Sequence, residues 1–243
     1  ILYRSLHHAN DRLVSLLLAA DAYRRARVAR LVLVAPYLCY LRQDAVFRPG
    51  QPLSRDVVGR WLGGAFDRII TVQAHLHRTA DLTDVFGARS ESLSIAGDLA
   101  VLAAGGDRPL IVGPDIESWP LAEDAANRLG TDWVVFDKTR LGDRQVRLSL
   151  KAPDKVAGRA VLLLDDVCSS GGTMEQAITL LRQAGATSVD VTVAHALFDS
   201  DVEARLRAAG ARRILSSDSV PNPTNAMELA DVLATALREE ITA

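Results

Sequence analysis

Short runs of apolar, often β-branched residues alternate along the chain with longer segments of mixed polarity. Several of the runs are apolar at consecutive positions, as Val-Leu-Leu-Leu is at 161–164, which is typical of strands covered on both faces. Because the apolar runs alternate with helix-favouring segments, the predicted fold class is α/β, with mostly parallel sheets flanked by helices. The pattern predicts strands over 30–35, 68–72, 110–113, 133–136, 160–165, 188–194 and 212–215.

The segments between these runs carry start and stop signals of helices. Asn10 or Asp11 and then Ser54 can cap the first two helices, and Gly185 can end a later one. Helices are predicted over 10–27, 54–64 and 172–182, with a final helix within 226–243.

The strand and helix units fall into two groups, with a seam near residue 95. Each group has its own loop of chemically reactive residues, which favours two α/β domains over one continuous sheet, the alternative. The expected domains are 1–95 and 96–225, and the final helix is expected to pack back on the first of them.

Charge and apolar content narrow the classes of function. The 243 residues include 28 Lys and Arg against 30 Asp and Glu, a net charge of −2, which argues against a broad basic surface for nucleic acid. No run approaches the roughly 20 apolar residues that cross a bilayer. Cys39 and Cys168 lie in apolar runs and are expected to be reduced thiols. We therefore expect a cytoplasmic protein with no nucleic-acid or membrane partner.

The most informative segment, 161–173, reads Val-Leu-Leu-Leu-Asp-Asp-Val-Cys-Ser-Ser-Gly-Gly-Thr. A buried strand ends in two carboxylates, Asp165 and Asp166, and a loop of small residues then opens a helix. The N–H groups and dipole of a helix start favour phosphate, while carboxylates hold sugar hydroxyls directly or through a metal. The segment matches neither the Lys-containing phosphate loop nor the Gly-rich dinucleotide loop. It predicts a ribose 5-phosphate site whose phosphate contacts are Ser169, Ser170, Gly171, Gly172 and Thr173; the alternative is a solvated Asp-Asp turn.

The same segment resembles the 5-phosphoribosyl-1-pyrophosphate (PRPP) motif that phosphoribosyltransferases share with ribose-phosphate pyrophosphokinases, also called PRPP synthetases. A second segment, from Val34-Ala-Pro-Tyr to Pro-Leu-Ser54, is similar to the ATP-site segment of the pyrophosphokinases, which simple phosphoribosyltransferases lack. In that family an Arg-Gln pair contacts ATP, and the resemblance gives this role to Arg42 and Gln43. A planar guanidinium suits phosphate oxygens; the alternative is an exposed turn.

Two further segments resemble the metal-binding parts of the pyrophosphokinases. In 69–78 the match to the family's histidine, which coordinates the Mg²⁺ of ATP, falls on His75. Segment 110–118 resembles the family's pyrophosphate loop, and the match to the Asp that helps hold the second metal falls on Asp115. Gln73 stands where the family often has Asp. The alternative for Asp115 is a turn former. His77 can contribute to the same site as His75, or it can be merely a polar residue of a surface turn. His195 is given no role.

The segment Val-Phe-Asp-Lys-Thr-Arg at 135–140 resembles the mobile catalytic loop of the family. The resemblance makes Lys138 and Arg140 catalytic, since cations stabilise the negative charge that builds during phosphoryl transfer. Arg140 is also expected to contact ribose 5-phosphate. The alternative is a basic β-hairpin facing solvent.

Taken over 10–225, the resemblance implies two phosphoribosyltransferase-like domains and a ribose-phosphate diphosphokinase. The enzyme would use Mg²⁺, take ATP and ribose 5-phosphate as substrates, and associate as a homo-oligomer. The first domain is expected to lack about 40–50 residues that such proteins carry at their start. The alternatives are a non-catalytic regulatory subunit of the same family and a phosphoribosyltransferase.

Overall fold

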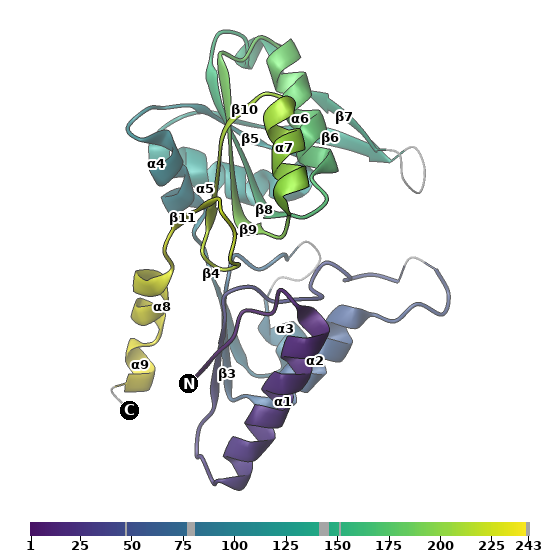
Figure 1. Cartoon of the computed structure of the whole chain (residues 1–243), viewed down its shortest axis with the longest axis vertical. Helices are drawn as coiled ribbons and strands as arrows, with labels where there is room; N and C mark the ends of the chain where they lie inside the picture. Colours follow the sequence, from purple (N-terminus) through teal and green to yellow (C-terminus); the bar gives the residue numbers. More distant parts are fainter. Residues whose placement is uncertain (47, 77–80, 141–145, 151, 242–243) are drawn as a thin grey trace. The chain divides into compact units, whose positions relative to one another are not determined.

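The computed structural model of the protein describes residues 1–46, 48–76, 81–140, 146–150 and 152–241 (Figure 1). The chain divides into two compact units. Unit 1 comprises residues 1–94 together with the chain from 229 onward, and unit 2 comprises residues 95–228. Each unit has its own sheet, so the alternative of one continuous sheet is wrong.

Unit 1 is built on a four-stranded sheet whose order is β1-β2-β3-β4 and whose strands are all parallel. The two central strands are buried at every position, as their apolar pattern predicted. The edge strands β1 and β4 were not predicted, because one is very short and the other is mostly polar. The strands are β1 (Leu2–Tyr3), β2 (Val32–Ala35), β3 (Arg68–Val72) and β4 (Arg89–Leu93).

Helices cover both faces of this sheet. Figure 1 shows α1, α2 and α3 on one face and α8 and α9 on the other. The expected side-chain caps of the first two helices are wrong: the residues before them are His8 and Leu53, and neither caps through its side chain. The helices are α1 (Ala9–Arg25), α2 (Ser54–Ala65), α3 (Thr83–Phe86), α8 (Ala230–Ala236) and α9 (Arg238–Ile241).

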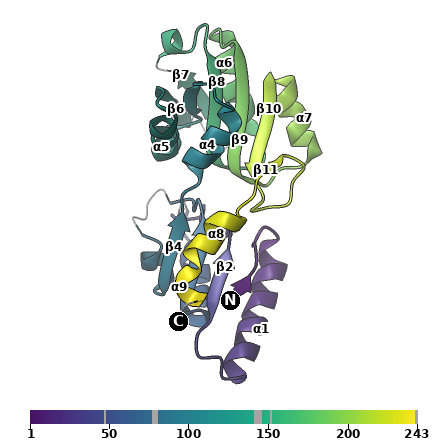
Figure 2. The same cartoon turned by 90° about the vertical axis from the view of Figure 1, so that its left-hand side faces the viewer.

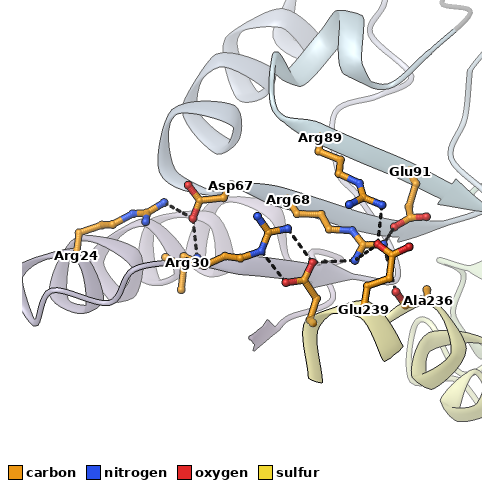
Figure 3. A network of polar contacts seen from close by, with 10 residues as sticks. Arg24, Arg30, Asp67, Arg68, Arg89, Glu91, Ala236 and Glu239 are labelled. Atoms are coloured by element: carbon orange, nitrogen blue, oxygen red, sulfur yellow. Dashed lines mark hydrogen bonds and ion pairs between the residues drawn. The ribbon is translucent and has the colours of Figure 1, made fainter. Parts of the chain in front are cut away.

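The last segment of the chain differs from the single helix expected within 226–243. It begins as a strand of unit 2, β11 (Asn225–Met227), and then forms the two short helices α8 and α9 (Figure 2). Glu240 of α9 accepts hydrogen bonds from Arg30 Nε at 2.6 Å and from Arg68 Nη1 at 2.8 Å. Figure 3 labels Arg30 and Arg68 within a larger network of polar contacts on the sheet of unit 1. Paired charges therefore dock the end of the chain on this unit.

Unit 2 contains a seven-stranded sheet of order β11-β10-β9-β8-β5-β6-β7. Every neighbouring pair is parallel except β6 and β7, which form an antiparallel hairpin. The strands are β5 (Leu110–Gly113), β6 (Trp133–Arg140), β7 (Val146–Leu150), β8 (Ala160–Cys168), β9 (Ser188–Ala196), β10 (Ala211–Ser217) and β11.

Two helix pairs cover the two faces of this sheet. Strand β8 lies between them, and its burial on both faces explains its continuously apolar sequence. Leu162 and Leu164 pack in the cluster of α4 and α5, while Val161 and Leu163 pack in the cluster of α6 and α7 on the opposite face. A strand buried on both faces needs apolar side chains at successive positions. The helices are α4 (Ala96–Ala104), α5 (Trp119–Leu129), α6 (Gly172–Gln183) and α7 (Ser200–Ala208), with 3₁₀ helices η1 (Ile116–Ser118) and η2 (Pro153–Lys155).

The expected α/β class, with mostly parallel sheets flanked by helices, is confirmed. Within the part of the chain that the structure describes, no helix is long and apolar enough to span a bilayer.

Candidate active site

Two carboxylates lie near the carboxyl end of β8. The strand continues to Cys168, three residues beyond its expected end, so Asp165 and Asp166 are part of the sheet rather than of the following loop. Asp166 is 6% exposed, Asp165 is half-buried, and the Asp166 N–H donates to Asp165 Oδ1 at 3.1 Å. Ligands of open parallel sheets bind at this edge. The pair is therefore placed where a ligand can reach it.

The loop after β8 leads into α6 through a glycine that tolerates no side chain. Gly171 has φ +76° and precedes the first helical residue, and a Cβ there would lie 2.5 Å from Val202 Cγ1. The residue that precedes this helix, Gly171, has no side chain that could cap it. The first N–H groups of the helix and the positive end of its dipole therefore suit an anion.

Replacing Gly171 by Ala is expected to lower the free energy of unfolding by about 2 kcal/mol, because the change adds both a left-handed Cβ and a clash with Val202. Gly172→Ala is the matched control, since a Cβ at Gly172 meets nothing within 4 Å. Urea denaturation of the two variants measures the difference. Equal stability of the two would show that the loop does not hold Gly171 as described.

An arginine that the sequence did not single out holds this loop. Arg205 of α7 donates to the carbonyl oxygen of Ser170 at 2.7 Å and pairs with Glu175 of α6 at 3.0 Å. It lies far along the chain from the loop, so no local pattern reveals it. The arginine fixes the loop against both helices and so sets where the α6 amides point.

Asp115 follows β5 and shapes the turn there. Its Oδ1 accepts from the N–H of Glu117 at 3.0 Å, and Ser118 Oγ donates to its carbonyl oxygen at 2.6 Å. The same Ser118 hydroxyl would lie 2.3 Å from a Cβ at Gly113, which explains the glycine before the turn. The turn-forming alternative is therefore present in the structure, and a metal role for Asp115 remains a prediction.

Lys138 and Arg140 lie on β6, which continues beyond the strand expected over 133–136. Lys138 pairs in register with Leu148 of β7, and Arg140 with Val146. The backbone here is thus the β-hairpin that the sequence left as an alternative. Residues 141–145, which connect its strands, lie outside the described residues.

The residues expected to contact ATP lie in unit 1, between β2 and α2. Arg42 is exposed. Gln43 donates from Nε2 to the carbonyl oxygen of Pro52 at 2.8 Å, and its Oε1 accepts from the hydroxyl of Ser54. Both ends of the Gln43 amide therefore tie the segment after β2 to the start of α2.

His75 follows β3 and is half-buried. Gln73, two residues earlier, has φ +41°, a left-handed conformation that is uncommon for a side-chain-bearing residue. Its N–H donates to the carbonyl oxygen of Leu93, and the next N–H donates to Ser92 Oγ, both at 2.8 Å. These bonds hold the turn that presents His75. His77 lies outside the described residues.

The described residues contain no group of three or more His, Cys, Asp or Glu side chains placed to hold a metal ion. His75 belongs to unit 1 and Asp115 to unit 2. A complete metal site made by side chains alone is therefore not preformed in the described part of either unit.

Comparison with known proteins identifies the family. A family model described as "Phosphoribosyl transferase domain" matches residues 93–225, and one described as "N-terminal domain of ribose phosphate pyrophosphokinase" matches residues 1–65. A protein of Methanopyrus kandleri named ribose-phosphate pyrophosphokinase is 33% identical over 231 residues, which cover 94% of this chain and 78% of that protein. The chain belongs to the ribose-phosphate pyrophosphokinase family.

Other pyrophosphokinases agree with this assignment. The ribose-phosphate pyrophosphokinase of Methanosarcina mazei is 32% identical over 92% of this chain and 74% of its own length. A crystal structure of phosphoribosylpyrophosphate synthetase from Mycobacterium smegmatis matches with a TM-score of 0.84 at 26% identity, over 99% of this chain and 80% of that chain. The resemblance seen in the sequence, with its two phosphoribosyltransferase-like domains, is confirmed.

Proposed function

We propose that this pyrophosphokinase transfers the diphosphoryl group of ATP to the anomeric hydroxyl of ribose 5-phosphate, giving PRPP and AMP. The observation that carries the proposal is the end of β8. There, two carboxylates precede a loop and a helix start whose N-cap residue, Gly171, has no side chain to cap it. A ligand with a phosphate at one end and a diol at the other needs a helix start and carboxylates side by side, because the helix start binds the phosphate and the carboxylates bind the diol.

In this proposal the PRPP motif binds ribose 5-phosphate. Asp165 and Asp166 accept hydrogen bonds from the ribose hydroxyls, and Arg140 gives a further contact to the sugar phosphate. The terminal phosphate is bound by the loop and first turn of α6, which comprise Ser169, Ser170, Gly171, Gly172 and Thr173.

Arg42 and Gln43 bind ATP, and His75 and Asp115 hold Mg²⁺. Asp115 offers the carboxylate oxygen that this ion prefers, because Mg²⁺ keeps several waters and is usually held by one or two carboxylates together with substrate phosphates. The imidazole of His75 is an unusual ligand for so hard a cation, so its role is partly to orient phosphate or water. The lack of a three-residue cluster among the described residues is compatible with a cation that arrives on its nucleotide. When bound, Mg²⁺ would neutralise phosphate charge.

The transfer step forms a bond between the anomeric oxygen and the β-phosphorus of ATP and breaks the bond from that phosphorus to the oxygen of departing AMP. Negative charge then increases on the transferring group and on AMP. Lys138 and Arg140 supply the cations that stabilise this charge. No side chain is assigned as general base for the attacking hydroxyl.

The proposal extends to the form in which the protein works. Segments 1–95 and 96–225 act as the pyrophosphokinase N-terminal domain and the phosphoribosyltransferase-like domain. The protein acts as a cytoplasmic homo-oligomer, with no nucleic-acid or membrane partner.

Binding of ribose 5-phosphate, measured by titration calorimetry, tests the proposed site. Asp166→Asn is expected to weaken binding about 10- to 100-fold, because charge-assisted hydrogen bonds to the sugar are lost. Asp190→Asn is the control, since Asp190 is a buried carboxylate at the opposite end of the neighbouring strand β9. Unchanged affinity of Asp166→Asn would place the sugar elsewhere.

A further inference from the structure

Strands β9 and β10 are linked at their carboxyl ends by a buried polar cluster. His195 of β9 is 2% exposed, and its Nδ1 lies 2.8 Å from Ser219 Oγ, just after β10. Ser217 and Ser219 both donate to the carbonyl oxygen of Ala194, at 2.6 and 3.1 Å. The two hydroxyls are also 3.0 Å apart. We call His195, Ser217 and Ser219 the carboxyl-end cluster.

The carboxyl-end cluster adjoins the strand that carries the two site carboxylates. His195 pairs in register with Val167 of β8, the residue after Asp166. Beyond this pair, the N–H of Leu197 donates to the carbonyl oxygen of Cys168 at 2.8 Å, which ties the chain after β9 to the chain after β8. The last residue of β8, Cys168, which immediately precedes the phosphate-binding loop, is therefore bonded to the chain that follows His195.

We propose that His195, acting through Ser219, is a positioning residue for ribose 5-phosphate. His195 fixes the end of β9, and the carboxylates of β8 and the loop before α6 lie beside this end. The inference rests on the proposed function. It is supported by burial, since a polar ring kept from water is stable only when its nitrogens have partners. Loss of the bond lets the end of β9 shift, and displacements of about 1 Å at a binding site have large effects.

The same two strands supply a control at their other ends. Asp190, near the start of β9, pairs with Arg212 Nη2 of β10 at 2.6 Å and is 5% exposed. It also pairs with the neighbouring Arg213. This link joins the same strands through buried polar groups, but it lies at the amino edge of the sheet, away from the ligand edge. Breaking it tests stability without touching the carboxyl-end cluster.

The test compares Ser219→Ala, His195→Phe and Asp190→Asn. In Ser219→Ala the Kd for ribose 5-phosphate by calorimetry and its KM are expected to rise about tenfold, with kcat and the KM for ATP within about threefold of the wild type. His195→Phe keeps a ring of similar size and is expected to behave alike. Asp190→Asn is expected to lower the Tm at least as much as Ser219→Ala does, and to leave the Kd for ribose 5-phosphate within about twofold of the wild type. The double variant of His195 and Ser219 should bind no more weakly than His195→Phe alone.

The inference is wrong if Ser219→Ala, which removes one oxygen and is expected to fold, binds ribose 5-phosphate as tightly as the wild type. It is also wrong if all three variants lose affinity in proportion to lost stability, because the cluster would then be merely structural. Failure of the wild type to bind ribose 5-phosphate would instead contradict the proposed function.

Discussion

Replacing Lys138 by Ala is expected to lower the rate of AMP formation from ATP and ribose 5-phosphate by about 10²- to 10³-fold. A cation placed where charge builds contributes to the transition state more than to the bound substrates, so the loss falls on kcat. Ribose 5-phosphate is expected to bind with nearly unchanged affinity, because the change removes none of its proposed contacts, which are the two carboxylates of β8, the loop and first turn of α6, and Arg140. AMP release at saturating substrate, followed by chromatography, measures the first quantity, and calorimetry measures the second.

Lys155→Ala is the matched control for this experiment. Lys155 ends the 3₁₀ helix η2 of the same unit and is exposed, so the change removes an equal charge outside the proposed site. Its rate should stay within about twofold of the wild type. A Lys138→Ala protein that keeps a third or more of the wild-type rate would overturn the catalytic assignment of Lys138.

The second large effect is on stability. Arg68→Leu is expected to lower the free energy of unfolding by about 3 kcal/mol, because it breaks the buried ion pair of Arg68 with Glu240. Arg68 lies within the ionic network of Figure 3. The side chain of Arg68 is 2% exposed and bonds Glu240, Glu91 and the carbonyl oxygen of Ala236. Its loss leaves two carboxylates without this partner. Urea denaturation at neutral pH measures the change.

Arg89→Leu is the surface control for this prediction. Arg89 pairs with Glu239 at 2.8 Å, but both side chains are more than half exposed, at 58% and 65%. Exposed ion pairs contribute at most about 1 kcal/mol. If Arg68→Leu cost no more than Arg89→Leu, the docking of α9 would not depend on the buried charges.

The pH dependence of stability gives a second measure of the same network. Hydrogen bonds from Arg30 and Arg68 lower the pKa of Glu240 from 4.5 to about 2. A carboxyl whose pKa falls on folding stabilises the protein above its unfolded pKa. That contribution disappears as the pH falls from about 4.5 to about 2. Arg68→Leu is expected to flatten the acid side of the stability profile in this window.

The part of the fold that the sequence predicted is the part that apolar patterning controls. Strand β8 was found because both its faces are buried, and the same holds for β3 and β5. The edge strand β4 was not predicted, because Arg89 and Glu91 make its sequence polar. The partners of these two residues lie in α9 and on β3. Ion pairs between segments so distant in sequence leave no periodic signal.

The candidate site likewise has a part that the sequence predicted and a part that only the structure revealed. Asp165, Asp166 and the glycine loop could be predicted because a strand, a loop and a helix start follow one another within a single short segment. The groups that hold this segment in place, Arg205 and the carboxyl-end cluster, come from elsewhere in the chain. Their roles follow only from three-dimensional contacts.

The proposed reaction is defined by attack on the β-phosphorus of ATP. Phosphorus-31 NMR of the protein with ATP, Mg²⁺ and ribose 5-phosphate tests this directly. Transfer of an intact diphosphoryl group predicts that AMP and PRPP appear in equal amounts while ADP does not form. Appearance of ADP with a singly phosphorylated product, or spectra in which ATP and ribose 5-phosphate persist unchanged, would contradict it.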